Sequence, residues 1–323
     1  MPVVRDRIQS KLNNFREYTI LDARDLAEYV GFTDDEVHTL CDEHGLDYAE
    51  CRSWYDGYRQ HGLEIYNPES VVMAVEDRKF KSYWSQTSTY QVIAERLREN
   101  FKGTRDAVIR MMAGESVDVR VTSYMNTLTD FATRDDIFTY LLHIGYLAYD
   151  EENGTCRIPN REIWQEWEFA AAVVDEYEET DNIIRASKEL LQATIDGDEE
   201  AVARALDESH IHVTGNRSYN NEDALQSAIY LAYLYAINKY TIIREATSGR
   251  GFADVVFTPI KQTDPALIIE LKRNSSTESA LDQIKEKRYF DCLSHYEGNL
   301  LFVGINYDEK DKTHTCRIER YVK

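Results

Sequence analysis

Two carboxylates and one lysine lie in neighbouring apolar segments of the C-terminal third of the sequence. Asp254 interrupts the apolar segment 252–257, and Glu270 and Lys272 follow the apolar run 266–269. Strand side chains alternate between two faces, so Glu270 and Lys272 project from the same face of one predicted strand. Carboxylates bind hard divalent cations, and a nearby ammonium can orient water or neutralise a phosphate. The spacing therefore suggests a site that hydrolyses a phosphodiester.

Two other triplets of the form Asp/Glu-x-Lys occur, at 77–79 and 308–310. Both lie in polar sequence typical of turns, where a solvated group of charges is expected. Only the triplet at 270–272 follows a run with the character of a buried strand. Burying its charges costs free energy unless they are paired or bind a metal. An ordinary strand end is the alternative interpretation.

The surrounding sequence predicts the elements that position these residues. Apolar residues recur at helical spacing in two segments, and β-branched and apolar runs predict strands between and after them. The expected order is helix 221–238, strands 240–245, 252–258 and 266–271, helix 279–294 and strand 300–305. A turn is expected at 248–251, where Gly249 and Gly251 supply backbone conformations closed to other residues.

Four segments together resemble a known family, the PD-(D/E)XK nuclease superfamily. They are Glu222, the turn 248–254, the triplet 270–272 and the run 283–289. The resemblance is strongest to nuclease domains that follow an AAA-ATPase-like domain in many bacterial proteins. It implies an α/β C-terminal domain with a restriction-endonuclease-like core, in which an αβββαβ order builds a central mixed sheet flanked by helices.

The resemblance also implies roles for individual side chains. Asp254 and Glu270 would bind Mg²⁺ or Mn²⁺, with Glu222 assisting from the first helix. Lys272 would serve the attacking water and the scissile phosphate, and Gln283 would belong to the motif on the second helix. The implied activity is metal-dependent hydrolysis of phosphodiester bonds in nucleic acid.

Contacts to nucleic acid are predicted for Ser248, Arg250, Lys285, Arg288 and Tyr289. Each has a simpler alternative: Arg250 decorates a turn, and Lys285 and Arg288 belong to a solvated helix face.

The acids and the amide of the site also have simpler alternatives. Glu222 is a first-turn acid favoured by the helix dipole, and Gln283 is a solvated helix residue. Glu245 is an alternative metal ligand at a strand end.

The N-terminal part resembles the same bacterial family, in the helical region that follows its ATPase core. A mainly helical domain is expected at 1–180 and the nuclease-like domain at 181–323. Thr33 and Glu36 form a predicted capping box, and 134–159 suggests a helix followed by a hairpin. Aromatic residues near Trp54, Tyr66 and Trp84 either stack on nucleic acid or fill gaps between helices, and the second use is the commoner one.

No phosphate-binding loop of the form Gly-x-x-x-x-Gly-Lys-Ser/Thr occurs in the sequence. We therefore expect no ATP hydrolysis by this chain, which resembles the lid region and the nuclease domain without the ATPase core.

The formal net charge of −21 is distributed unevenly. From residue 220 onward, 14 Lys and Arg face 15 Asp and Glu, a net of −1, so the preceding part carries −20. Acidity repels phosphate backbones, and the acidic part is therefore expected to face solvent or a protein partner. Three acids of the neutral part are proposed metal ligands, so bound cations would make that part positive.

The cysteines and the apolar segments bear on the cellular compartment of the protein. Five cysteines without a C-x-x-C pair favour a reducing cytoplasm, and we expect neither a signal peptide nor a membrane span.

Two functions compete with the nuclease. One is a catalytically inactive module that binds nucleic acid or protein and works with an ATPase partner, and the other is a structural adaptor.

Overall fold

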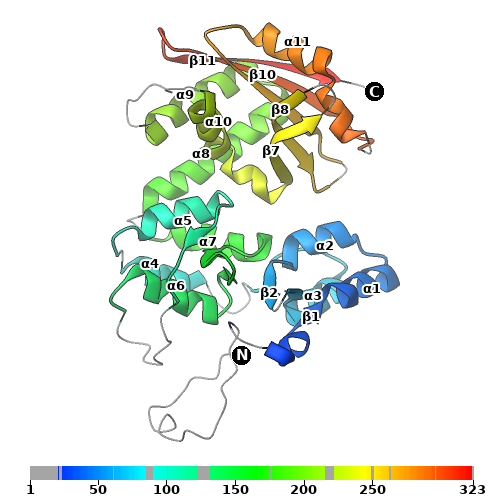
Figure 1. Cartoon of the computed structure of the whole chain (residues 1–323), viewed down its shortest axis with the longest axis vertical. Coiled ribbons are helices and arrows are strands. Elements are labelled where there is room, and N and C mark those ends of the chain that lie inside the picture. The colour runs from blue at the N-terminus through cyan, green and yellow to red at the C-terminus, as the bar shows by residue number, and fades with distance from the viewer. Residues whose placement is uncertain are drawn as a thin grey trace, which may run out of the picture. The chain divides into compact units, whose positions relative to one another are not determined.

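The computed structural model describes residues 21, 24–60, 62–84, 90–99, 101–121, 131–174, 177–214, 222–248, 251–261, 263–294 and 296–321. The chain divides into two compact units, Met1–Asp181 and Asn182–Lys323. Figure 1 colours the first unit from blue to green and the second from green to red.

A five-stranded mixed sheet forms the centre of the second unit, in the order β11-β10-β9-β8-β7. Its strands are β7 (Tyr240–Ser248), β8 (Gly251–Pro259), β9 (Ala266–Arg273), β10 (Leu300–Asp308) and β11 (Thr313–Tyr321). Strands β9 and β10 pair in parallel, and the other neighbours pair antiparallel. The prediction of an α/β core with a mixed sheet is confirmed.

Helices cover both faces of this sheet (Figure 1). They are α8 (Glu178–Asp196), α9 (Glu199–Thr214), α10 (Glu222–Ala232), α11 (Thr277–Lys287) and the 3₁₀ helices η5 (Leu234–Asn238) and η6 (Tyr289–Leu293). One face packs Phe257 and Leu267 against α8, α9 and α10. The other packs Ile268 and Phe302 against α11 and η6. Because both faces are covered, β9 is buried from Ala266 to Leu271 without alternation.

Both predicted helices end earlier than expected, and the sheet has one more strand than the predicted order. The first predicted helix stops at Ala232 and continues as η5. The second stops at Lys287, because Arg288 adopts a left-handed conformation with φ 55° that ends an α-helix. Strand β11 adds a fifth strand beyond the six predicted elements, and it pairs with β10 along its whole length.

The first unit combines helices with two small three-stranded antiparallel sheets, in the orders β1-β3-β2 and β4-β6-β5. Its helices are α1 (Asp34–His44), α2 (Tyr48–Tyr55), α3 (Pro68–Asp77), α4 (Tyr90–Leu97), α5 (Thr104–Met112), α6 (Arg134–His143), α7 (Arg161–Ala172) and the 3₁₀ helix η2 (Arg24–Tyr29). Its strands are β1 (Phe32–Thr33), β2 (Tyr58–Gln60), β3 (Leu63–Tyr66), β4 (Val117–Asp118), β5 (Ala148–Asp150) and β6 (Thr155–Arg157).

Local sequence signals explain several of these elements. The capping box of α1 is present, with the Thr33 N–H donating to Glu36 Oε2 over 2.8 Å. Helix α6 is followed by the β5–β6 hairpin, as the sequence suggested. Trp54, Tyr55 and Tyr66 are buried in one apolar cluster, so these aromatic residues fill the core rather than a stacking surface.

A buried carboxylate links separate parts of the first unit. Glu162 of α7 accepts hydrogen bonds from Ser70 Oγ of α3 over 2.8 Å and from the N–H groups of Tyr83 and Trp84 over 2.7 and 3.1 Å. Burial raises the pKa of Glu162 to about 7, and the three donors oppose this shift. This carboxylate therefore fixes segment 83–84 against both helices.

Gly304 lets α11 approach the sheet beside the triplet at 270–272. It pairs with Glu270 in the β9–β10 register. A Cβ atom at this position would lie 2.6 Å from the main-chain oxygen of Thr277, the first residue of α11. The absence of a side chain therefore sets the distance between α11 and the strand that carries Glu270.

We predict that Gly304→Ala destabilises the protein by about 1–3 kcal/mol, because the added methyl group forces the start of α11 away from the sheet. Urea unfolding followed by circular dichroism measures the change. Thr315→Ala, at an exposed position on β11, serves as the control. Equal stability of the Gly304→Ala and control variants would show that α11 is not tightly seated.

Candidate active site

Strands β8 and β9 separate at the position of Asp254. Their described pairs run from Phe257 with Leu267 to Val255 with Ile269. One step further, the same register places Asp254 opposite Glu270. Here the N–H of Leu271 donates to the side-chain Oδ2 of Asp254, over 2.7 Å. The aspartate side chain therefore takes a main-chain hydrogen bond at the point where the strands diverge, and this fixes its carboxylate beside β9.

Glu270 and Lys272 lie on one face of β9, as the spacing of two predicts. The Glu270 side chain is 2% exposed, and its Oε1 accepts from Lys272 Nζ over 2.8 Å. Its Oε2 is buried and has no hydrogen-bond partner in the described part of the chain. One carboxylate oxygen is thus available for a ligand that the protein itself does not supply.

Burial and the nearby charge of Asp254 raise the pKa of Glu270 to about 7, against the opposing effect of Lys272. The effect of Asp254 shows that the two carboxylates are close enough to repel each other. A cation between them would remove this repulsion.

Gln283 and Tyr289 extend the site into α11 and η6. Lys272 Nζ also donates to Gln283 Oε1 over 2.8 Å, and Gln283 Nε2 donates to the Tyr289 hydroxyl over 3.0 Å. The charges of Glu270 and Asp254 contribute to raising the pKa of Tyr289, after burial as the main cause. A continuous hydrogen-bonded row therefore runs from Glu270 through Lys272 and Gln283 to Tyr289.

Three predicted residues cannot be placed. Glu222 begins α10 and Ser248 ends β7, but their side chains lie outside the described residues, as does Arg250 entirely. The side chain of Glu245, the alternative ligand, is also outside.

Lys285 and Arg288 are described. Each forms an ion pair with an acid outside the hydrogen-bonded row that runs from Glu270 to Tyr289. Lys285 Nζ lies 2.6 Å from Glu319 Oε2, and Arg288 Nε lies 3.1 Å from Asp291 Oδ2. All four side chains are at least 40% exposed, so these ion pairs are weak.

One contributing residue was not predicted. Gln226 of α10 donates from Nε2 to the main-chain oxygen of Asp254 over 2.9 Å. It follows Glu222 by four residues, so the two positions share one face of the helix. This spacing was the available signal, and it links α10 to the end of β8.

Among the described side chains, no group of three or more His, Cys, Asp or Glu could hold a metal ion. The two described acids nevertheless fit a divalent cation, since Glu270 Oε2 is buried without a described partner and Asp254 lies opposite Glu270 in the strand register. The side chain of Glu222, the third predicted ligand, lies outside the described residues.

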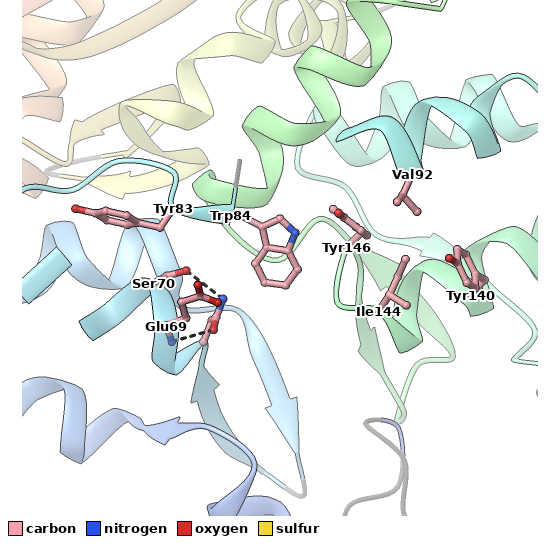
Figure 2. A pocket seen from close by; sticks show the side chains of 9 residues that line it. Glu69, Ser70, Tyr83, Trp84, Val92, Tyr140, Ile144 and Tyr146 are labelled. Carbon is pink, nitrogen blue, oxygen red and sulfur yellow. Dashed lines mark hydrogen bonds between the residues drawn. The ribbon is translucent and has the colours of Figure 1, made fainter. Parts of the chain in front are cut away.

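A cavity in the first unit is a second candidate (Figure 2). Its volume is about 420 Å³, and it is lined by Asn67, Glu69, Ser70, Tyr83, Trp84, Val92, Tyr140, Ile144 and Tyr146. Its polar lining is engaged locally: Asn67 Nδ2 donates to Ser70 Oγ over 3.0 Å, and Ser70 donates to Glu162. Asn67 caps α3 and Ser70 holds Glu162, so both of these polar groups have a structural role.

Two acids and a lysine at the end of a buried strand form a set of groups that could hold a divalent cation beside a phosphate. Residues 220–316 match the family model of the PD-(D/E)XK nuclease superfamily.

The whole chain has a more distant relative. A protein from Azotobacter chroococcum mcd 1, named an uncharacterized protein in the vnfD 5′ region, is 24% identical over 318 residues. The match covers 94% of this chain and 58% of that relative, so the chain spans little more than half of the relative's length. No solved structure gives a significant match. In the described residues, no helix is both long and apolar enough to span a membrane.

We predict that Glu270→Gln stabilises the metal-free protein above pH 7. With a folded-state pKa of about 7 and an ordinary value of 4.5, folded Glu270 keeps its proton between these pH values while the unfolded chain loses it. The stability of the wild type therefore falls as the pH rises through this window. The glutamine keeps an acceptor for Lys272 without the buried charge, and the expected gain at pH 8 is about 1–3 kcal/mol.

Urea unfolding in EDTA at pH 5 and pH 8 measures this difference. Glu286→Gln, at an exposed position on α11, is the matched control. A Glu270→Gln protein less stable than the wild type at pH 8 would contradict the buried, repelled carboxylate.

Proposed function

We propose that the chain is a metal-dependent nuclease that hydrolyses phosphodiester bonds in nucleic acid, with DNA as the favoured substrate. The observation that carries the proposal is the state of Glu270. One oxygen receives Lys272, and the other is buried beside Asp254 without a described partner. The match of residues 220–316 to the PD-(D/E)XK nuclease superfamily supports the same activity.

Asp254 and Glu270 would hold Mg²⁺ or Mn²⁺, with Glu222 as the third ligand. The contact of Gln226 with the Asp254 main chain supports this choice, because it brings the helix face that includes position 222 to the end of β8. A bound cation supplies two effects: it lowers the pKa of water and stabilises negative charge on the phosphate.

The protein side chains would then orient the reaction. Water would attack phosphorus, form the new P–O bond and release its proton to solvent, while the bond to the leaving oxygen breaks and that oxygen takes up a proton from solvent. The ammonium of Lys272 donates one N–H to Glu270 and one to Gln283, and its third N–H has no partner among the described residues. That N–H is directed to a phosphate oxygen, where it stabilises the charge that develops in the transition state. Gln283 holds the ammonium in place.

Contacts to the nucleic acid would come from Ser248, Arg250, Lys285, Arg288 and Tyr289. The ion pairs of Lys285 and Arg288 are exposed and weak, so phosphates can replace Glu319 and Asp291 at little cost. Tyr289 ends the hydrogen-bonded row that begins at Glu270.

The first unit would serve a different purpose. Its acidity favours a protein partner over nucleic acid, and its sequence resembles the lid region of an AAA-ATPase-like domain over 1–180. Without a phosphate-binding loop, ATP would be hydrolysed by a partner rather than by this chain. We infer a cytoplasmic location from the cysteine content.

The same acidity supports a second candidate function, an inactive module that binds nucleic acid or protein beside an ATPase. The two candidates differ at Asp254 and Glu270, because a module used only for binding has no need of a cation there. Titration calorimetry with Mn²⁺ distinguishes them.

We predict that Asp254→Asn and Lys272→Ala each reduce Mn²⁺-dependent cleavage of labelled DNA by about 100-fold or more. The first change removes a metal ligand, and the second removes stabilisation of the transition state. Initial rates on single- and double-stranded DNA and RNA, with and without Mn²⁺, give the measurement.

Lys287→Ala is the matched control, since this lysine is exposed on α11 and outside the proposed site. Circular dichroism checks that all three variants fold. Wild-type rates in both Asp254→Asn and Lys272→Ala would remove the proposed site.

A further inference from the structure

The cavity of the first unit has a lining that combines aromatic rings with one carboxylate (Figure 2). Trp84 and Tyr140 are partly exposed in it, while Tyr83 and Tyr146 are only 4% and 2% exposed. Glu69 of α3 is the one charged residue among the described residues of the lining. Aromatic faces beside a carboxylate are the groups that bind an organic cation.

Trp84 is held in place at both its main chain and its ring. Its N–H donates to Glu162 over 3.1 Å, and Ser70, the residue after Glu69, donates to the other oxygen of that carboxylate over 2.8 Å. A Cβ atom at Gly145 would lie 3.3 Å from Cη2 of Trp84, so the indole ring rests against the turn after α6. The ring therefore adjoins the start of α3, and a ligand would not have to order it.

The charge of the first unit favours a cation in this cavity. Residues 1–181 contain 19 Lys and Arg and 36 Asp and Glu, a net charge of −17. A helix N-terminus attracts anions, but at α3 the side chain of Asn67 already accepts the N–H of Glu69 over 3.2 Å. Glu69 itself adds a negative charge to that first turn. A phosphate or another anion would therefore be repelled.

Basic residues of the chain already contact two of the lining rings. Lys81 Nζ lies 4.7 Å from the centroid of the Tyr83 ring, and Arg96 Cζ lies 5.9 Å from that of Tyr140. Both cations are paired with acids, at 2.9 and 2.5 Å respectively. They therefore do not cancel the negative charge of the unit, and they show that cations are stable against this lining.

A guanidinium suits Trp84 and Glu69 better than an ammonium does. It is planar, stacks on an indole ring and pairs with a carboxylate through two parallel N–H groups. The same unit contains such a stacked pair, because Arg161 Cζ lies 4.2 Å from the centroid of the Trp54 ring. A lysine ammonium is a strongly hydrated point charge and lacks the planar fork.

We propose that this cavity binds an arginine side chain of a protein partner, whose guanidinium stacks on Trp84 and pairs with Glu69. The acidity of the first unit attracts a basic partner at long range, and the cavity selects arginine at short range. The inference rests on the protein partner proposed for the first unit. It is independent of the nuclease site, because every described lining residue belongs to the first unit.

The test measures the binding of two fluorescein-labelled peptides to the full-length protein by fluorescence anisotropy, at about 0.15 M salt to screen exposed charges. One peptide carries three arginines among glycines and serines, and the other carries three lysines at the same positions. We expect the arginine peptide to bind at least about fivefold more tightly than the lysine peptide. Trp84→Leu should remove this difference, and Trp84→Phe, which keeps a ring, should retain part of it.

Substitution of the carboxylate tests the second contact. Glu69→Gln should weaken binding of the arginine peptide by about threefold or more, because the guanidinium loses its counter-ion. Glu43→Gln, which removes an exposed acid of α1 outside the cavity lining, is the matched control and should bind as the wild type does. Circular dichroism checks that every variant folds.

The inference is overturned by equal binding of the two peptides to the wild type, by no binding of either, or by unchanged binding in Trp84→Leu. A labelled single-stranded oligonucleotide that binds through Trp84 in place of the peptide also overturns it. Cleavage in Mn²⁺ keeps this failure apart from that of the proposed function. A wild type that cleaves but does not select arginine overturns only the arginine site. A wild type that selects arginine through Trp84 but cleaves nothing overturns only the nuclease.

Discussion

The candidate site of the second unit depends on the buried carboxylate of Glu270. Glu270 is 2% exposed and lies opposite Asp254 in the register of β8 and β9, and its Oε2 has no hydrogen-bond partner among the described residues. Desolvation and repulsion both favour its neutral form, and Lys272 only partly offsets them. Such an arrangement is unfavourable for folding, and a cation bound by both acids would offset this cost. The strands around it provide the burial, and Gly304 and α11 complete that enclosure.

The geometry of the candidate site follows from the point where the pairing between β8 and β9 ends. Strands β8 and β9 pair up to Val255 and Ile269, and the side chain of Asp254 then takes the N–H of Leu271. This hydrogen bond holds the Asp254 carboxylate beside β9. The site is therefore a consequence of ending one strand pair early.

The sequence predicted the parts of this arrangement that depend on local spacing. The apolar run 266–269 indicated β9, and period two put Glu270 and Lys272 on one face, where they form an ion pair. The role of Gln226 and the break at Arg288 were missed. A side chain that reaches a main-chain oxygen across 28 residues leaves no local pattern, and a left-handed arginine follows from tertiary packing rather than from propensity.

Charge then differs between the two units. Residues 1–181 carry −17 and residues 182–323 carry −4, and Arg273, Lys285 and Arg288 of the second unit are paired with acids. Under the proposed function, a chain of this charge would gain little from the release of counterions, so its affinity for nucleic acid would depend weakly on salt. Binding would then rest on local contacts: the cation proposed at Asp254 and Glu270, and the ammonium of Lys272. Both act only at short range, so a phosphate would have to reach the buried end of β9.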